Sequence, residues 1–157
     1  MKKTCFVITG YGVKTDLQTG KDYNLDNTYK NIIKPVFEEL DFECFRAFDI
    51  NPEAITIDSA YNWLLKADIL IADITSLNVN VMYELGVRHS LNPRGTIVIA
   101  DKSITIPFNI NHLNINFYEH LGKDIGYGEV MRFRELLKEI DSPIYNSIPS
   151  LKPPVTK

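Results

Sequence analysis

The sequence predicts a three-layer α/β fold, in which helices cover both faces of a mostly parallel sheet of five strands. Two observations support this prediction. Short aliphatic runs alternate with longer segments of helical periodicity, and the central run, residues 68–74, is apolar at consecutive positions. A run of that kind is typical of a strand covered on both faces, as in parallel sheets. Alternating strands and helices favour a doubly wound sheet with the flavodoxin-like strand order 2-1-3-4-5.

The length of each apolar run and the spacing of its apolar residues predict the individual strands and helices. The predicted strands are residues 4–9, 42–48, 68–74, 96–100 and 115–118. The predicted helices are residues 26–40, 52–65, 79–91 and 129–140. Asp26 or Asn27 is expected to cap the first helix. Pro35 lacks a backbone donor and is expected to kink that helix or distort its middle turn.

Two segments lie outside the alternation. Residues 10–25 form a long polar connection after the first strand, and such connections in compact domains are usually functional or disordered. The C-terminal segment contains four prolines, at positions 143, 149, 153 and 154, and is interpreted as a tail or linker. We therefore expect one domain over residues 1–141 and a tail over residues 142–157.

Composition excludes several classes of partner. The chain has 17 Lys and Arg against 20 Asp and Glu, a formal net charge of -3, and no block of like charge. Nothing in this balance indicates nucleic acid or an anionic membrane as a partner. No apolar run has the length of a membrane span, so a cytoplasmic location is expected. Cys5 and Cys44 lack the spacing of metal or redox motifs and are interpreted as buried thiols.

Polar residues and glycines follow the predicted strands, at the edge where ligands bind in open parallel sheets. The candidates are Gly10, Tyr11, Gly12, Asp49, Asp73, Thr75, Ser76, Asn78 and Asn80, with Asp101 after the fourth strand. The two glycines permit close backbone approach to a sugar or phosphate, but a plain tight turn is the favoured explanation for this pair alone. Asp49 and Asp73 have an alternative interpretation as turn or cap residues.

Glu84 is the candidate reactive group. On a helix beginning near Val79, Asn80, Glu84 and Arg88 share one stripe. One interpretation is an ordinary ion pair between Glu84 and Arg88. The other is that Glu84 leans back over the ligand-binding edge and attacks or stabilises a developing cationic sugar carbon. His89, near the end of the helix, is interpreted as structural.

Three segments carry a resemblance to a known family: CFVITGYGVKTDLQTGKDYNLDNTYKNIIKPVFEEL, LLKADILIADITSLNVNVMYELGVRHSL and TIVIADKSITIPFNI. They resemble the Rossmann-like domains related to nucleoside 2-deoxyribosyltransferases and, more distantly, TIR domains. The resemblance covers roughly residues 4–120. It implies a five-stranded flavodoxin-like core and, in the enzymatic relatives, cleavage of an N-glycosidic bond. Glu84 matches their catalytic glutamate, and Tyr11 stands where the nearest relatives have a phenylalanine that would stack on a base.

The leading hypothesis is therefore an N-glycosidase or glycosyltransferase-like domain that acts on a nucleoside, a nucleotide or NAD. Glu84 would act on the anomeric carbon, Asp73, Asn78 and Asn80 would hold the sugar, and residues 10–12 would border the base or phosphate. No metal and no other cofactor is expected, because metal-ligand spacing is absent. The resemblance also implies a homodimer and a setting in bacterial signalling or defence.

An alternative function stays open because of Asn78. The transferases carry an aspartate at this position, and an amide binds a hydroxyl but cannot act as an anion. This difference favours a non-catalytic nucleotide-binding sensor or assembly module.

Overall fold

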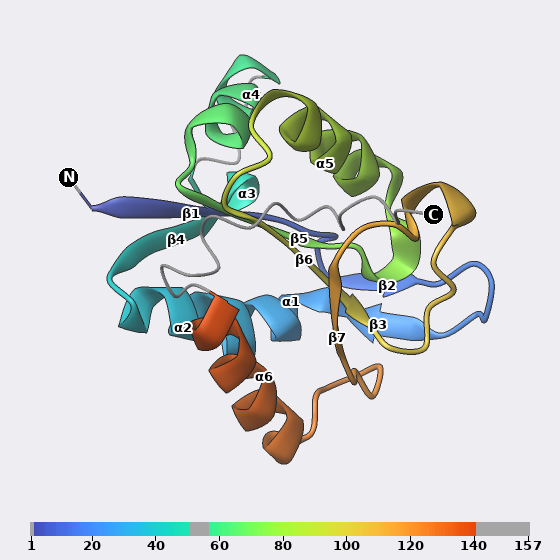
Figure 1. Cartoon of the computed structure of the whole chain (residues 1–157). Coiled ribbons are helices and arrows are strands. Elements are labelled where there is room, and N and C mark those ends of the chain that lie inside the picture. Colours follow the sequence, from blue (N-terminus) through green and yellow to red (C-terminus); the bar gives the residue numbers. More distant parts are fainter. Residues whose placement is uncertain (1, 51–56, 141–157) are drawn as a thin grey trace, which may run out of the picture.

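A five-stranded parallel sheet forms the centre of the computed structural model, which describes residues 2–50 and 57–140 (Figure 1). The strand order is β4-β1-β5-β6-β7, which corresponds to the predicted order 2-1-3-4-5. The strands are β1 (Lys3–Ile8), β4 (Phe42–Arg46), β5 (Ile69–Asp73), β6 (Thr96–Asp101) and β7 (Ile115–Tyr118). Each neighbouring pair of this sheet is parallel. The predicted fold class is confirmed.

Helices cover both faces of the sheet, as Figure 1 shows. The central strand β5 packs against both layers because its side chains alternate between them. Ile69 and Ile71 belong to one hydrophobic core, whereas Leu70 and Ala72 belong to the other. The helices of the first layer are α1 (Leu25–Thr28), α2 (Lys34–Glu39) and α6 (Tyr127–Ile140). Those of the second layer are α4 (Ile57–Lys66) and α5 (Val79–Leu91).

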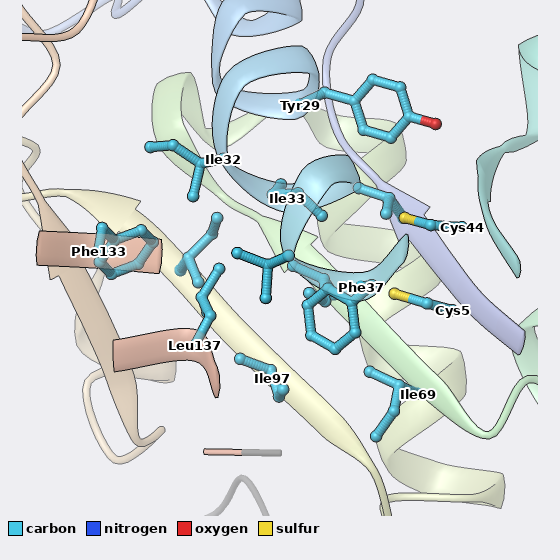
Figure 2. Packing of buried hydrophobic residues seen from close by; sticks show 14 of the residues in the cluster. Cys5, Tyr29, Ile32, Ile33, Phe37, Cys44, Ile69, Ile97, Phe133 and Leu137 are labelled. Carbon is cyan, nitrogen blue, oxygen red and sulfur yellow. The ribbon is translucent and has the colours of Figure 1, made fainter. Parts of the chain in front are cut away.

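The first core is closely packed around α2 and α6 (Figure 2). Phe37 from α2 and Leu137 from α6 are fully buried in it. Cys5 and Cys44 are register partners on β1 and β4, and both are buried as thiols. The interpretation of the two cysteines as small buried side chains is therefore confirmed.

The first predicted helix is interrupted in the middle, as Pro35 led us to expect. A π-helical turn, Tyr29–Ile33, separates α1 from α2, and Pro35 lies in the first turn of α2. In an uninterrupted α-helix the carbonyl of Asn31 would accept a bond from residue 35, which has no N–H. Arg134 of α6 supplies the missing donor, with its Nε 2.8 Å from the Asn31 oxygen. The distortion therefore anchors α6 to this layer.

The predicted cap of this helix was wrong. Asn24 occupies the N-cap position, without a side-chain capping bond, and Asp26 lies in the first turn. The reason is a β-hairpin within residues 10–25, formed by β2 (Val13–Thr15) and β3 (Asp22–Asn24). The chain passes directly from β3 into the helix, which leaves no loop for a capping side chain. The two hairpin strands are short and polar, so they lack the apolar alternation that marks a strand in sequence.

Other boundaries differ by a few residues. The second strand ends at Arg46, and Ala47–Ile50 forms a helical turn, α3. The closing helix begins at Tyr127 rather than at residue 129. The predicted helix start at Pro52 and the predicted tail over residues 142–157 lie outside the described residues. Within the described part of the chain, no helix has the length and apolarity needed to span a membrane.

Candidate functional site

The parallel sheet brings the ends of its strands to one edge. Because β1, β4, β5 and β6 all run in the same direction, the residues that follow them lie at the carboxyl edge. Gly10, Tyr11 and Gly12 follow β1, Asp49 lies in α3 after β4, and Thr75 follows β5. The structure therefore places the predicted site residues on the edge at which ligands bind in this class of fold.

Arg46 connects three segments at this edge. Its side chain is almost fully buried, with Nη1 2.7 Å from Asp26 Oδ1, Nε 3.1 Å from Asp49 Oδ2 and Nη2 3.2 Å from Asp49 Oδ1. The guanidinium also lies over the rings of Tyr11 and Tyr29, at 5.0 and 4.1 Å from their centres. Asp49 is therefore an ion-pair partner within the protein.

The two carboxylates bonded to Arg46 have lowered pKa values. Burial by itself raises the pKa of Asp49 and of Asp26, but the hydrogen bonds that each accepts outweigh it and lower both values. For Asp49 the dominant donor is Arg46. For Asp26 the N–H of Gly12, 3.1 Å away, acts together with Arg46. The positive φ of Gly12, 66°, directs its N–H to Asp26, so this glycine shapes the turn after β1.

Tyr11 presents a ring at the carboxyl edge. The ring is 38% exposed and lies 5.2 Å from the ring of Phe48, which is 52% exposed. The Tyr11 hydroxyl accepts a bond of 3.1 Å from the backbone N–H of Phe48. Burial is the main cause that raises the pKa of Tyr11, and the charge of Glu84 adds to it. The two rings therefore form a fixed aromatic surface near Glu84.

Asp73 and Thr75 lie beneath the surface. Asp73 is fully buried, and it accepts bonds from the Thr75 hydroxyl at 2.7 Å, the Thr75 N–H at 3.1 Å and the Tyr118 hydroxyl at 2.8 Å. Thr75 in turn accepts the N–H of Asp101. Burial raises the pKa of Asp73 more than these bonds lower it. Both residues therefore hold the loop after β5 in place and have no surface open to a ligand.

The loop between β5 and α5 has a strained backbone. Ser76 and Leu77 adopt φ values of 70° and 52°, a region that residues other than glycine rarely occupy. Asn78 then caps α5, with its Oδ1 accepting the N–H of Asn80 at 3.0 Å and that of Val81 at 3.3 Å. The cap uses the side-chain oxygen of Asn78, so the side-chain NH2 group of this residue takes no part in the cap. The exposed Asn80 lies in the first turn of the helix.

Glu84 is a partly buried carboxylate. Burial is the single cause that raises its pKa. Among the described residues, no Lys, Arg or His nitrogen lies within 4.0 Å of its carboxylate oxygens. The charge of Glu84 contributes to the raised pKa of Tyr11. For Tyr61, the hydrogen bond to Tyr83 is the leading cause of the raised pKa, and the charge of Glu84 adds to it. The Tyr61 and Tyr83 hydroxyls are 3.3 Å apart.

The ion pair between Glu84 and Arg88 is not formed, so that interpretation was wrong. Arg88 is fully buried, and its guanidinium donates to the carbonyls of Leu64 at 2.7 Å, Ala67 at 3.1 Å and Arg94 at 2.7 Å. The carbonyls at the end of α4 have no helical partners of their own, and Arg88 satisfies them. Because Arg88 binds these carbonyls inside the protein, Glu84 lacks its expected partner.

A second polar network at this edge was not predicted. Asp101 is buried and accepts bonds from the Tyr23 hydroxyl, from the Ser103 N–H and hydroxyl, and from the His120 N–H. The His120 ring bonds to the Asn24 carbonyl and the Gly122 N–H, so it does not contact Ser103 as a catalytic base would. Only Asp101 could have been found from sequence, by its position after a strand.

Two pockets lie away from Glu84. One, of about 350 Å³, is at the amino edge of the sheet and is lined in part by Lys3, Lys66 and Arg94. The other, of about 520 Å³, runs beside the edge strand β4, where Asp49 is one of its lining residues. Over residues 2–50 and 57–140, no group of three or more His, Cys, Asp and Glu side chains is arranged to hold a metal ion.

The doubly wound sheet with polar residues at its carboxyl edge defines a Rossmann-like α/β domain with a flavodoxin-like strand order. Comparison of the chain with models of protein families and with curated proteins found no match. The resemblance to deoxyribosyltransferases and TIR domains therefore rests on the sequence motifs, and its functional meaning is a proposal.

Proposed function

We propose that the domain cleaves an N-glycosidic bond in a nucleoside, a nucleotide or NAD, with Glu84 acting on the anomeric carbon. The observation that carries this proposal is the environment of Glu84. It is a partly buried carboxylate without a cationic partner among the described residues, beside an aromatic surface at the ligand-binding edge. Keeping such a charge poorly solvated costs stability, and a developing positive charge on a sugar carbon would offset that cost.

The reaction follows from the chemistry of a carboxylate and a glycoside. As the bond between the anomeric carbon and the base nitrogen breaks, its electron pair leaves with the base. An oxygen of Glu84 forms a bond to the anomeric carbon or stabilises its positive charge. Water then attacks this carbon, releases the sugar and restores the carboxylate, while its proton passes to solvent. A neutral base takes up one proton from water.

The remaining predicted residues have supporting roles in this proposal. The rings of Tyr11 and Phe48 would stack on the base, since they are fixed against each other and partly exposed. Asn80 and the amide group of Asn78 would bind sugar hydroxyls. Asp73 and Thr75 would hold the loop after β5 without touching the substrate, because both are fully buried. Asp49 would act indirectly, because it bonds to Arg46, which lies over the ring of Tyr11.

Release of free base tests the proposal. The purified protein is incubated with NAD and a panel of nucleosides and nucleotides, and the products are separated by chromatography. Glu84→Gln is expected to slow base release by at least about 100-fold, the usual effect of losing a catalytic acid, base or nucleophile. Glu139→Gln, at an exposed position of α6, serves as the matched control and should leave the rate unchanged.

The alternative is a non-catalytic nucleotide-binding module. It is supported by the absence, among the described residues beside Glu84, of a second carboxylate that is not already bonded within the protein. If no compound releases base while a nucleotide raises the melting temperature, the binding function replaces the catalytic one. Equal rates for Glu84→Gln and the parent protein would rule out the role of Glu84.

A further inference from the structure

The charges around Tyr11 and Glu84 are predominantly negative. Asp26 and Asp49 both pair with the guanidinium of Arg46, and Tyr11 is subject to the charges of Asp49 and Glu84 against that of Arg46 alone. All three nitrogen atoms of the guanidinium are bonded to Asp26 or Asp49, and Arg46 is 6% exposed. Arg46 is therefore not available to bind a phosphate group.

In the described part of the chain, no cation forms an ion pair with Glu84. Burial alone accounts for its raised pKa, without an opposing effect of any lysine or arginine. Lys14, the lysine nearest to the turn after β1 in sequence, packs its stem over Gly10, where an added Cβ would lie 2.8 Å from Lys14 Cγ. Since Lys14 forms no ion pair with Glu84, a phosphate on a sugar held by Glu84 would meet a carboxylate that no cation of the described residues neutralises.

The aromatic side chains at the site already bind one cation. Arg46 lies over the rings of Tyr11 and Tyr29. The ring of Phe48 packs against Tyr11 on one side and is otherwise half exposed, and Tyr83 is 64% exposed next to Glu84. Electron-rich ring faces near the carboxylate of Glu84, which has no ion-pair partner among the described residues, attract a positively charged ligand by the same physical means.

Among the described residues, the site also lacks a second carboxylic acid that could protonate a leaving base. Among the described residues, Asp26 and Asp49 are bonded to Arg46 with lowered pKa values, and Asp73 is buried beneath the surface. Burial raises the pKa of Tyr11, which makes its hydroxyl a weaker acid. A neutral base needs a proton when it leaves, whereas a positively charged base does not.

We propose that this site selects N-glycosides with a positively charged base and without phosphate, such as pyridinium or N-alkylated purine nucleosides. The inference rests on the proposed function and specifies its substrate. When the glycosidic bond breaks, the electron pair passes to the positively charged ring nitrogen, and the base leaves uncharged. Glu84 bonds to the anomeric carbon, and water later replaces it and gives its proton to solvent. No co-reactant other than water is required.

A matched set of three compounds tests the selection by charge. They are the carbocyclic analogue of nicotinamide riboside, which cannot be hydrolysed, its uncharged dihydropyridine form, and its 5′-monophosphate. Calorimetry with the parent protein is expected to show the cationic nucleoside binding about 3- to 30-fold more tightly than the uncharged form. The monophosphate should bind more weakly than the nucleoside, and salt should narrow that difference because it screens the repulsion.

Two variants test the source of the preference. Phe48→Leu should reduce the preference for the cationic over the uncharged compound. Phe117→Leu removes an aromatic ring of similar exposure from β7, at the opposite end of the sheet, and should leave the preference unchanged. A monophosphate that binds as tightly as the nucleoside, equal binding of the charged and uncharged forms, or no binding of any of the three would overturn the proposal.

The outcome is separable from that of the proposed function. If the compounds bind in the expected order but no natural glycoside releases its base, catalysis fails and charge selection stands. If base is released but the monophosphate binds best, catalysis stands and charge selection fails.

Discussion

Glu84 carries a stability cost that its removal should reveal. Burial raises its pKa above the ordinary value of 4.5, so the folded protein holds the proton to higher pH than the unfolded chain does. Above the raised pKa the folded state contains a poorly solvated charge, and stability falls as pH rises through that range. We expect Glu84→Gln to raise the melting temperature at pH 7 by roughly 1–3 °C, which corresponds to a fraction of a kcal/mol for a chain of this size.

The pH dependence distinguishes this explanation from a general packing effect. The gain in melting temperature for Glu84→Gln should disappear near pH 4, where the parent carboxyl group is protonated as well. Differential scanning calorimetry at the two pH values measures both effects. A variant that is less stable than the parent at pH 7 would show that Glu84 makes a net favourable interaction in the folded state.

Arg88 is a structural residue whose loss should be costly. Its guanidinium bonds to three backbone carbonyls and to the Thr96 hydroxyl, all of which Arg88→Met would leave without this donor. Since each buried polar group without a partner costs on the order of 1–3 kcal/mol, we expect a total loss of about 3 kcal/mol after relaxation. Urea denaturation measures the change in the free energy of unfolding.

A matched substitution separates this effect from the loss of a positive charge. Arg94 is exposed, and only its backbone carbonyl contacts Arg88. Arg94→Met should therefore change the free energy of unfolding by less than about 0.5 kcal/mol. Similar losses for the two variants would mean that net charge, and not the bonds to the carbonyls, determines the role of Arg88.

At the scale of elements, α5 contains a glycine that the fold does not require. Gly86 lies inside the helix, and an added Cβ would meet no atom within 4 Å. Because glycine loses more backbone freedom than alanine in a helix, Gly86→Ala is expected to increase the free energy of unfolding by about 0.5–1 kcal/mol.

Gly95 provides the opposite case for the same substitution. Its φ is 66°, and an added Cβ would lie 2.2 Å from the carbonyl oxygen of Asp68. Since backbone atoms cannot move away easily, Gly95→Ala should destabilise the protein by more than about 1 kcal/mol. Chemical denaturation of both variants checks the pair, and a destabilised Gly86→Ala would show that α5 needs its exposed face clear of side chains.

The sequence predicted elements with a strong local pattern and missed those defined by distant partners. The helix Val79–Leu91 and the strand Ile115–Tyr118 have the predicted bounds, and the helix ends coincide with the cap residues Asn78 and Asn92. The hairpin before Leu25 was missed, since its strands are short and polar. Spacing placed Glu84 and Arg88 on one stripe, but it did not show that carbonyls from α4 draw Arg88 away.

Across the whole molecule, the candidate site lies between the central sheet, whose inner strands are paired on both sides, and a separate two-stranded hairpin. Strands β5 and β6 are each paired on both sides and are fully buried along their lengths. The hairpin β2–β3 forms a separate two-stranded sheet. Tyr23 connects it to the main sheet through Asp101 and Ser103, while Lys21 bonds to the His120 carbonyl. The turn with Tyr11 therefore lies between a rigid sheet and a less supported hairpin.

This difference predicts two regimes of amide hydrogen exchange. The amides of β5 and β6 should exchange only through global unfolding, whereas those of β2 and β3 should exchange through local opening. Tyr23→Phe removes the hydroxyl that bonds to Asp101, which contributes about 1 kcal/mol, so the hairpin amides should exchange about fivefold faster. Tyr127→Phe, at an exposed ring, is the control. An equal acceleration of β5 and β6 in Tyr23→Phe would show that the hairpin unfolds together with the sheet, and then the turn holding Tyr11 would be as rigid as the core.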